Sequence, residues 1–145
     1  MIQRILVVCI GNICRSPMAE GLLKLALPDV QISSAGISAK VGHGADPIAV
    51  HIMAELGIDI SRHRARMLTD VIARDADLIL VMDDAQKAQL SIQYPYVHGK
   101  TYLLAEATKQ NIHDPYKQEP EVFHSALSKI QNGVNEWVKR INSIR

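Results

Sequence analysis

Short, almost continuous apolar runs divide the chain at intervals. Such runs predict buried parallel strands that are covered on both faces, rather than strands with one face in water. The two clearest runs occupy residues 4–8 and 76–82, and shorter strands are expected over residues 31–34 and 101–104.

Between these runs, apolar residues recur every three or four positions, which predicts amphipathic helices. The expected helices cover residues 16–27, 46–56, 83–91 and a long segment from residue 119 almost to the end. Local signals mark some helix ends: Ser16 and Asp46 fit N-cap positions, Pro17 and Pro47 fit first turns, and Gly57 follows the second helix. The last helix is long enough to cover one face of a sheet.

Strands that alternate with helices indicate an α/β fold. We expect a single domain over residues 1–145: a doubly wound, four-stranded parallel sheet with helices on both faces. No repeat or linker divides the chain, and a hydrophobic content of 48% is sufficient for one core. Ligands of such sheets bind at the carboxyl ends of the strands.

Composition narrows the partners and the compartment. Sixteen Lys and Arg against fifteen Asp and Glu give a net charge of +1 with no long basic run, so no nucleic-acid partner is expected. The N-terminal apolar run is too short for a signal peptide or a membrane span, which favours a cytoplasmic protein that is not membrane-embedded. Two cysteines in C-x4-C spacing fit neither a disulfide scaffold nor a zinc site, so we expect no metal and a reducing compartment.

The first strand leads into a loop that carries a cysteine and an arginine. Five residues separate Cys9 from Arg15, enough for the loop to wrap an anion, present backbone N–H groups and return a guanidinium to the same point. The following helix N-terminus stabilises both a phosphate and a thiolate. The pattern predicts a phosphate-binding loop with Cys9 as nucleophile. The alternative for Cys9 is an inert buried thiol, and the alternative for Arg15 is a surface ion pair.

Phosphoryl transfer through a cysteine also needs an acid for the leaving oxygen. Asp114 is the best candidate, because Pro115 stiffens the backbone after it and a turn there can aim the carboxyl group at a pocket. Asp-Pro by itself is a weak signal, and Asp114 could be only a turn residue. A tyrosine leaving group, with a pKa of about 10, requires protonation near neutral pH.

Several segments together resemble the low-molecular-weight protein tyrosine phosphatases, and they occur in the order found in that family. They are Cys9 to Ser16, Ser34-Ala35-Gly36, His63-Arg64-Ala65-Arg66, Asp77 to Asp83 and Asp114-Pro115-Tyr116. The resemblance implies that Cys9 forms a phosphocysteine, that Arg15 and the loop amides hold the phosphoryl oxygens, and that Asp114 protonates the leaving phenolate and then activates water. No cofactor is implied.

The resemblance also implies roles for neighbouring residues. Ser16 is expected to donate a hydrogen bond to the Cys9 thiolate, while Asn12, Ser34 and His63 brace the loop. The expected substrate-binding residues are Ile10, Gly11, Asn12, Ile13, Cys14 and Tyr116. Cys14 is either a packing residue or a redox-protective thiol that pairs with oxidised Cys9, and we favour the second role.

Two differences from the sequence patterns of related families affect which substrate we expect. A similarity to protein arginine phosphatases would lead one to expect threonine at position 13, whereas Ile13 favours an aromatic ring. Lys117 replaces the second aromatic residue of the eukaryotic pattern, and residues 37–45 contain no aromatic residue. The chain therefore resembles the bacterial members associated with capsule and exopolysaccharide production, whose usual partner is an autophosphorylating tyrosine kinase.

Two other functions stay open at this point. Related families reduce arsenate with the same loop, but they commonly use further cysteines, and none follows Cys14. A non-catalytic phosphate-binding regulatory module is the third possibility; it would bind phosphotyrosine without turnover.

Overall fold

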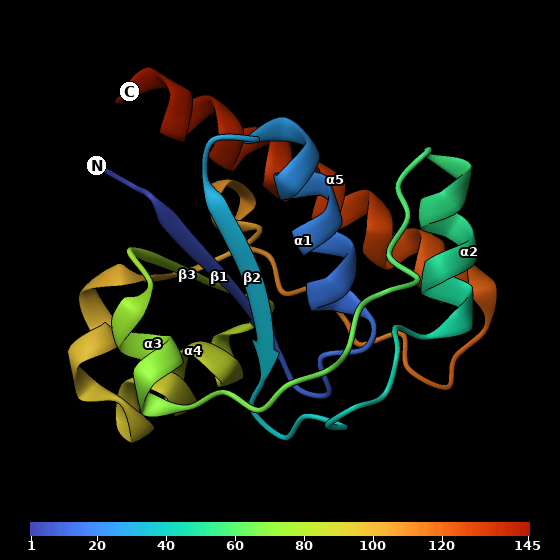
Figure 1. Cartoon of the computed structure of the whole chain (residues 1–145), viewed down its shortest axis with the longest axis horizontal. Coiled ribbons are helices and arrows are strands. Elements are labelled where there is room, and N and C mark those ends of the chain that lie inside the picture. Colours follow the sequence, from blue (N-terminus) through green and yellow to red (C-terminus); the bar gives the residue numbers. More distant parts are fainter.

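A computed structural model describes all residues, 1–145, and places four parallel strands in one sheet of order β2-β1-β3-β4 (Figure 1). The strands are β1 (Arg4–Cys9), β2 (Gln31–Gly36), β3 (Leu78–Val81) and β4 (Thr101–Leu103). The predicted four-stranded parallel α/β fold is confirmed.

Five α-helices connect and cover the strands. They are α1 (Arg15–Ala26), α2 (Pro47–Glu55), α3 (Asp70–Asp75), α4 (Asp84–Gln93) and α5 (Pro120–Ser143), and two 3₁₀ helices, η1 (Pro95–Lys100) and η2 (Glu106–Thr108), lie between α4 and α5. None of the helices has the length and apolar character that a membrane-spanning helix needs.

Each face of the sheet carries its own hydrophobic core, because successive strand residues point to opposite faces. On one face, Ile5 and Val7 of β1 pack with residues of α1, α2 and α5. On the other face, Leu6 and Val8 pack with residues of α3, α4 and η1. Figure 1 shows α1 and α5 together on one side of the strands, with α3 and α4 on the other. Helices therefore cover both faces, as predicted.

Three local predictions differ from the structure. Ser16 is not an N-cap: α1 begins at Arg15, its N-cap residue is Cys14, and no side chain caps it. The Ser16 hydroxyl instead hydrogen-bonds the Cys9 sulfur. Helices α3 and η1 were not predicted, because each is only six residues long and buries a single residue, which leaves no periodic pattern. Strand β2 continues beyond the predicted end at residue 34 to Gly36, which pairs with Cys9.

Other predicted ends agree with the structure. The Asp46 carboxylate accepts a hydrogen bond from the Ile48 N–H and caps α2, with Pro47 in the first turn. Gly57 follows α2 with a φ of 78°, a left-handed conformation that glycine adopts without steric cost. Helix α5 packs against α1 and α2 on one sheet face.

Candidate active site

The loop between β1 and α1 is formed by the last residue of β1, Cys9, and the residues up to Arg15, the first of α1. Both ends are buried, with 3% of Cys9 and 2% of Arg15 exposed. Asn12 turns the loop with a φ of 59°, a left-handed conformation that asparagine tolerates better than most residues. The chain thus wraps around the N-terminus of α1, where backbone N–H groups and the helix dipole favour an anion.

Two donors contact the Cys9 sulfur. The Ser16 hydroxyl lies 2.9 Å from Sγ, and the Asn12 backbone N–H donates to the same atom at 3.3 Å. Both contacts are buried. They stabilise a thiolate, which is the nucleophilic form of cysteine.

The Asn12 side chain fixes the direction of these hydrogen bonds. Its Oδ1 accepts from the backbone N–H of Arg66 at 2.9 Å, so its Nδ2 must face the other way. Nδ2 donates to the Ser16 hydroxyl at 2.7 Å and to the Ser34 hydroxyl at 3.0 Å. Since Ser16 Oγ accepts from Asn12, its own hydrogen is free to donate to Cys9.

The backbone of the loop is held from a second side. His63 Nε2 lies 2.6 Å from the Asn12 carbonyl oxygen, and because a carbonyl can only accept, Nε2 carries the proton. Arg66 Nε donates to the Ser34 carbonyl oxygen at 2.8 Å and ties the segment after α2 to β2. Asn12, Ser16, Ser34 and His63 are therefore in one hydrogen-bond network.

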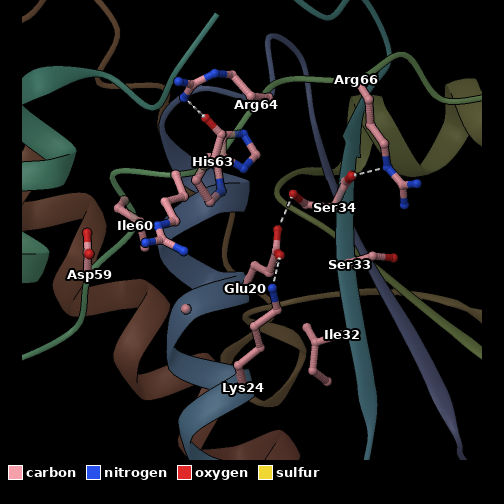
Figure 2. Close-up of a pocket in the computed structure, with 13 residues that line it drawn as sticks. Glu20, Lys24, Ile32, Ser33, Ser34, Asp59, Ile60, His63, Arg64 and Arg66 are labelled. Atoms are coloured by element: carbon pink, nitrogen blue, oxygen red, sulfur yellow. Dashed lines mark hydrogen bonds and ion pairs between the residues drawn. The ribbon is translucent and has the colours of Figure 1, made fainter. Parts of the chain in front are cut away.

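This network ends in a charged cavity behind the loop (Figure 2). Figure 2 shows the Glu20 carboxylate between the Ser34 hydroxyl, which donates to it, and the Lys24 ammonium group, 2.6 Å away. The cavity has a volume of about 430 Å³ and lies between α1, β2 and the segment that carries Arg64 and Arg66. Glu20 can only accept, so it orients the Ser34 hydroxyl away from Asn12.

Arg15 brings the β1–α1 loop together with two other loops. Its Nη1 donates to the Ile112 carbonyl oxygen at 2.8 Å and lies 3.6 Å from the Asp83 carboxylate. Its Nη2 lies 3.7 Å from the Asp114 carboxylate. Three segments that are distant in the sequence therefore meet at the carboxyl edge of the sheet.

Asp114 lies at the entrance with 44% of its side chain exposed. Its Oδ1 accepts from the Tyr116 N–H at 3.1 Å, which makes the Asp-Pro-Tyr segment a turn closed by the aspartate. The other carboxylate oxygen faces Arg15.

A cavity of about 220 Å³ opens above Cys9. Aliphatic, aromatic and charged side chains line it together: Cys9, Ile10, Gly11, Ile13, Cys14, Arg15, Ser38, Lys40, Asp114 and Tyr116. Of the predicted substrate-binding residues, only Asn12 is not in this lining, because its side chain is fully buried and supports the loop.

The second cysteine of the loop is a free, buried thiol. Burial and the nearby Asp46 and Asp114 carboxylates raise the pKa of Cys14 well above its usual range. The Cys14 thiol is therefore protonated at neutral pH.

Sequence reasoning missed three residues of this arrangement. Asp83, Arg66 and Glu20 contact Arg15, Asn12 and Ser34 respectively. Asp83 had a detectable signal, because it follows the buried strand β3 at the edge where ligands bind. Arg66 lies in the segment His63-Arg64-Ala65-Arg66 that carries the family resemblance, whereas nothing in the local sequence marks Glu20. No group of three or more His, Cys, Asp or Glu side chains in the chain is arranged to hold a metal ion.

A family model and a similar protein sequence both assign this chain to the same family. The model of the family described as low molecular weight phosphotyrosine protein phosphatase matches residues 4–144. A Ralstonia solanacearum protein named probable low molecular weight protein-tyrosine-phosphatase EpsP is 52% identical over 144 residues, which are 99% of each chain.

Solved structures of related proteins have the same fold. Vibrio vulnificus Wzb, in complex with benzylphosphonate, superposes with a TM-score of 0.93 at 36% identity, covering 97% of this chain and 99% of that one. The arginine phosphatase YwlE from Geobacillus stearothermophilus superposes with a TM-score of 0.91 at 32% identity, covering 97% and 94%.

Proposed function

The chain belongs to the low molecular weight phosphotyrosine protein phosphatase family and is a protein-tyrosine phosphatase, and on this premise we propose that it works through a phosphocysteine on Cys9. The observation that carries the proposal is the convergence of three groups on one cavity. Cys9 lies at its floor, with Arg15 and Asp114 in the lining. The two donors to Cys9 Sγ support a thiolate there.

In the first step, the Cys9 thiolate attacks phosphorus and the bond from phosphorus to the phenolic oxygen breaks. Asp114 gives its proton to that oxygen, so tyrosine leaves as a neutral phenol. Arg15 and the loop N–H groups hold the phosphoryl oxygens and balance the charge of the transition state. Arg15 Nε supports this role, because it is buried and has no hydrogen-bond partner within the chain.

In the second step, the Asp114 carboxylate takes a proton from water as the water oxygen attacks phosphorus. The sulfur–phosphorus bond breaks, and the electron pair returns to Cys9 as a thiolate. Inorganic phosphate leaves, and Asp114 is protonated again for the next cycle. The Ser16 hydroxyl, 2.9 Å from the sulfur, stabilises Cys9 as a leaving group.

The cavity lining supports an aromatic phosphoester as substrate. Ile13 and Tyr116 give it one aliphatic and one aromatic wall, which suits a flat apolar ring. The benzylphosphonate of the Wzb complex is likewise an aromatic ligand. The partner that we propose is a tyrosine-phosphorylated protein, namely an autophosphorylating bacterial tyrosine kinase in capsule or exopolysaccharide control. The similarity to the bacterial members of the family supports this partner.

A substrate panel tests this function. The purified protein, with EDTA present, is offered a phosphotyrosine peptide, a phosphoarginine peptide and arsenate with a thiol reductant. Rapid phosphate release from phosphotyrosine alone is expected, and Cys9→Ser should abolish it. Binding without turnover would favour the regulatory module, arsenite release would favour the reductase, and activity in Cys9→Ser would contradict the cysteine mechanism.

For Cys14 we propose redox protection of the nucleophile. Oxidation of Cys9 by peroxide gives a sulfenic acid, and the Cys14 sulfur displaces water from it to form a reversible disulfide. After a peroxide pulse long enough to oxidise an unprotected sulfenic acid further to the irreversible sulfinic acid, activity should return with dithiothreitol in the wild type and not in Cys14→Ser. Because burial keeps Cys14 protonated, disulfide formation should quicken as the pH rises. Equal recovery in both proteins would leave Cys14 as a packing residue.

A further inference from the structure

Two lysines flank the ring of Tyr116 at the cavity entrance. Lys40 Nζ lies 5.2 Å from the ring centroid and Lys117 Nζ lies 5.4 Å from it, both within cation–π range. Lys40 comes from the segment after β2, and Lys117 directly follows Tyr116. We call Lys40 and Lys117 the rim lysines.

The rim lysines have no carboxylate partner. Three of the other six lysines have one: Lys24 pairs with Glu20, Lys109 with Glu106 and Lys139 with Glu136. No ion pair or side-chain hydrogen bond within the chain occupies Lys40 or Lys117, so both charges are available to a ligand.

The position of Lys40 is fixed relative to the nucleophile. Its backbone N–H donates to the Gly11 carbonyl oxygen at 3.0 Å, and the N–H groups of Ile37 and Ser38 donate to Cys9 and Ile10, each at 3.0 Å. These hydrogen bonds continue from β2 along the phosphate-binding loop. Lys40 is thus attached to the same backbone that holds the phosphate.

Lys117 lies in a turn at a position that glycine or asparagine usually occupies. The Gln118 N–H donates to the Pro115 carbonyl oxygen at 2.8 Å and closes the turn, and Lys117 has a φ of 63°. Glycine or asparagine is the usual residue in this left-handed conformation. A long charged side chain held there in spite of the strain suggests a functional role, because backbone strain concentrates at ligand sites.

Two carboxyl groups at the site, those of Asp83 and Asp114, lie close to Arg15. Asp83 and Asp114 lie 3.6 Å and 3.7 Å from its guanidinium group, so Arg15 offsets one of the two negative charges, and Asp114 carries none while it holds the proton that it donates. The charges beside Tyr116 that have no partner are the positive charges of the rim lysines.

We propose that Lys40 and Lys117 make this enzyme selective for phosphotyrosines with acidic residues next to them. The proposal rests on the phosphotyrosine phosphatase function and specifies its substrate class. When a phosphotyrosine side chain occupies the cavity, the substrate residues next to it lie near Tyr116 and the rim lysines. Asp or Glu side chains at these substrate positions can form ion pairs with Lys40 and Lys117. Exposed pairs of this kind are weak singly and are screened by salt, so the selectivity belongs mainly to low and moderate ionic strength.

The test is a ratio of kcat/KM values for two phosphotyrosine peptides that differ only in flanking residues, Glu in one and Gln in the other. The wild type should prefer the Glu peptide by about 3- to 10-fold at low salt, and the preference should shrink in high salt. Lys40→Gln and Lys117→Gln should each reduce the ratio, and the double variant should bring it close to one. Lys139→Gln, which makes the same charge change on α5, should retain the wild-type ratio.

The outcomes separate this proposal from the function on which it rests. Equal kcat/KM values for the two peptides in an active wild-type enzyme would overturn the selectivity and leave the phosphatase function standing. A preference that survives in the double variant would also overturn it. Failure to hydrolyse either peptide would instead contradict the phosphatase function.

Discussion

At the scale of single residues, Asp114 should decide how strongly the rate depends on the leaving group. Asp114→Asn keeps the size and the contact with the Tyr116 N–H but cannot deliver a proton. Phosphotyrosine turnover should fall about 100-fold or more, because its phenolate is a poor leaving group. p-Nitrophenyl phosphate should be slowed much less, since its phenolate leaves without protonation. The check is kcat/KM for each substrate, because kcat/KM reports the first step, whereas kcat also contains the hydrolysis of the shared phosphocysteine, in which Asp114 is the base. An equal fall in kcat/KM for both substrates would contradict general acid catalysis.

Ser34 should support the rate without touching the substrate. It is buried, accepts from Asn12 and donates to Glu20, so Ser34→Ala removes one hydrogen bond from each partner, while Asn12 keeps its bond to Ser16 and Glu20 keeps its ion pair with Lys24. Such a loss costs about 1–3 kcal/mol, and we expect kcat/KM to fall about 10-fold as the loop loosens. Ser33→Ala is the matched control on β2, because the Ser33 side chain makes no hydrogen bond within the chain. Similar rates for the two variants would argue against a supporting role.

Some site residues can be predicted from their spacing along the sequence, whereas others reach the site only through tertiary packing. Cys9 and Arg15 share one short loop, and Asp114 precedes a proline, so local spacing is enough to nominate them. Asp83 and Glu20 take part only because β3 and α1 bring them beside Arg15 and Ser34. Such contacts depend on tertiary packing, which spacing along the chain does not encode.

At the scale of elements, Gly133 sets how closely α5 approaches the end of β4. A Cβ atom at this position would lie 2.6 Å from the Leu104 carbonyl oxygen, a backbone atom that cannot move aside cheaply. Gly133→Ala should therefore reduce the free energy of unfolding by about 1–3 kcal/mol, in spite of the better helix propensity of alanine. Urea denaturation measures the change.

Gly99→Ala provides the comparison, because a Cβ there meets no atom within 4 Å. Its free energy of unfolding should stay close to that of the wild type. If Gly133→Ala were as stable as Gly99→Ala, the close contact between α5 and Leu104 would be contradicted.

The elements that sequence predicts well are those with enough length or burial to form a pattern. Strand β3 is buried throughout, and α5 buries a regular stripe along 24 residues, so both are visible in the hydrophobic pattern. Helix α3 buries only Ala73, and its start depends on the Thr69 side chain, which accepts from the Ile72 N–H. A single cap and one buried alanine do not distinguish a helix from a turn.

At the scale of the whole molecule, the two cores hold a rigid sheet, and the loops at its carboxyl edge supply the chemistry. Proteins with this fold include the Erwinia amylovora tyrosine phosphatase AmsI and the arginine phosphatase YwlE, so the fold does not determine the substrate. The cavity lining and the rim lysines are the features that can do so, because the lining surrounds the space above Cys9 and both lysines lie beside Tyr116, one of its walls.

The central claim is that phosphate passes through Cys9, and rapid acid quenching tests it most directly. Enzyme mixed with a phosphotyrosine peptide is quenched within one turnover, digested and analysed by mass spectrometry for the residue that carries phosphate. Asp114→Asn, in which activation of water is also impaired, should increase the amount of this intermediate for an aryl phosphate with a good leaving group. We expect the phosphate on Cys9; phosphate on another residue, or turnover with no covalent phosphate in either protein, would contradict the account.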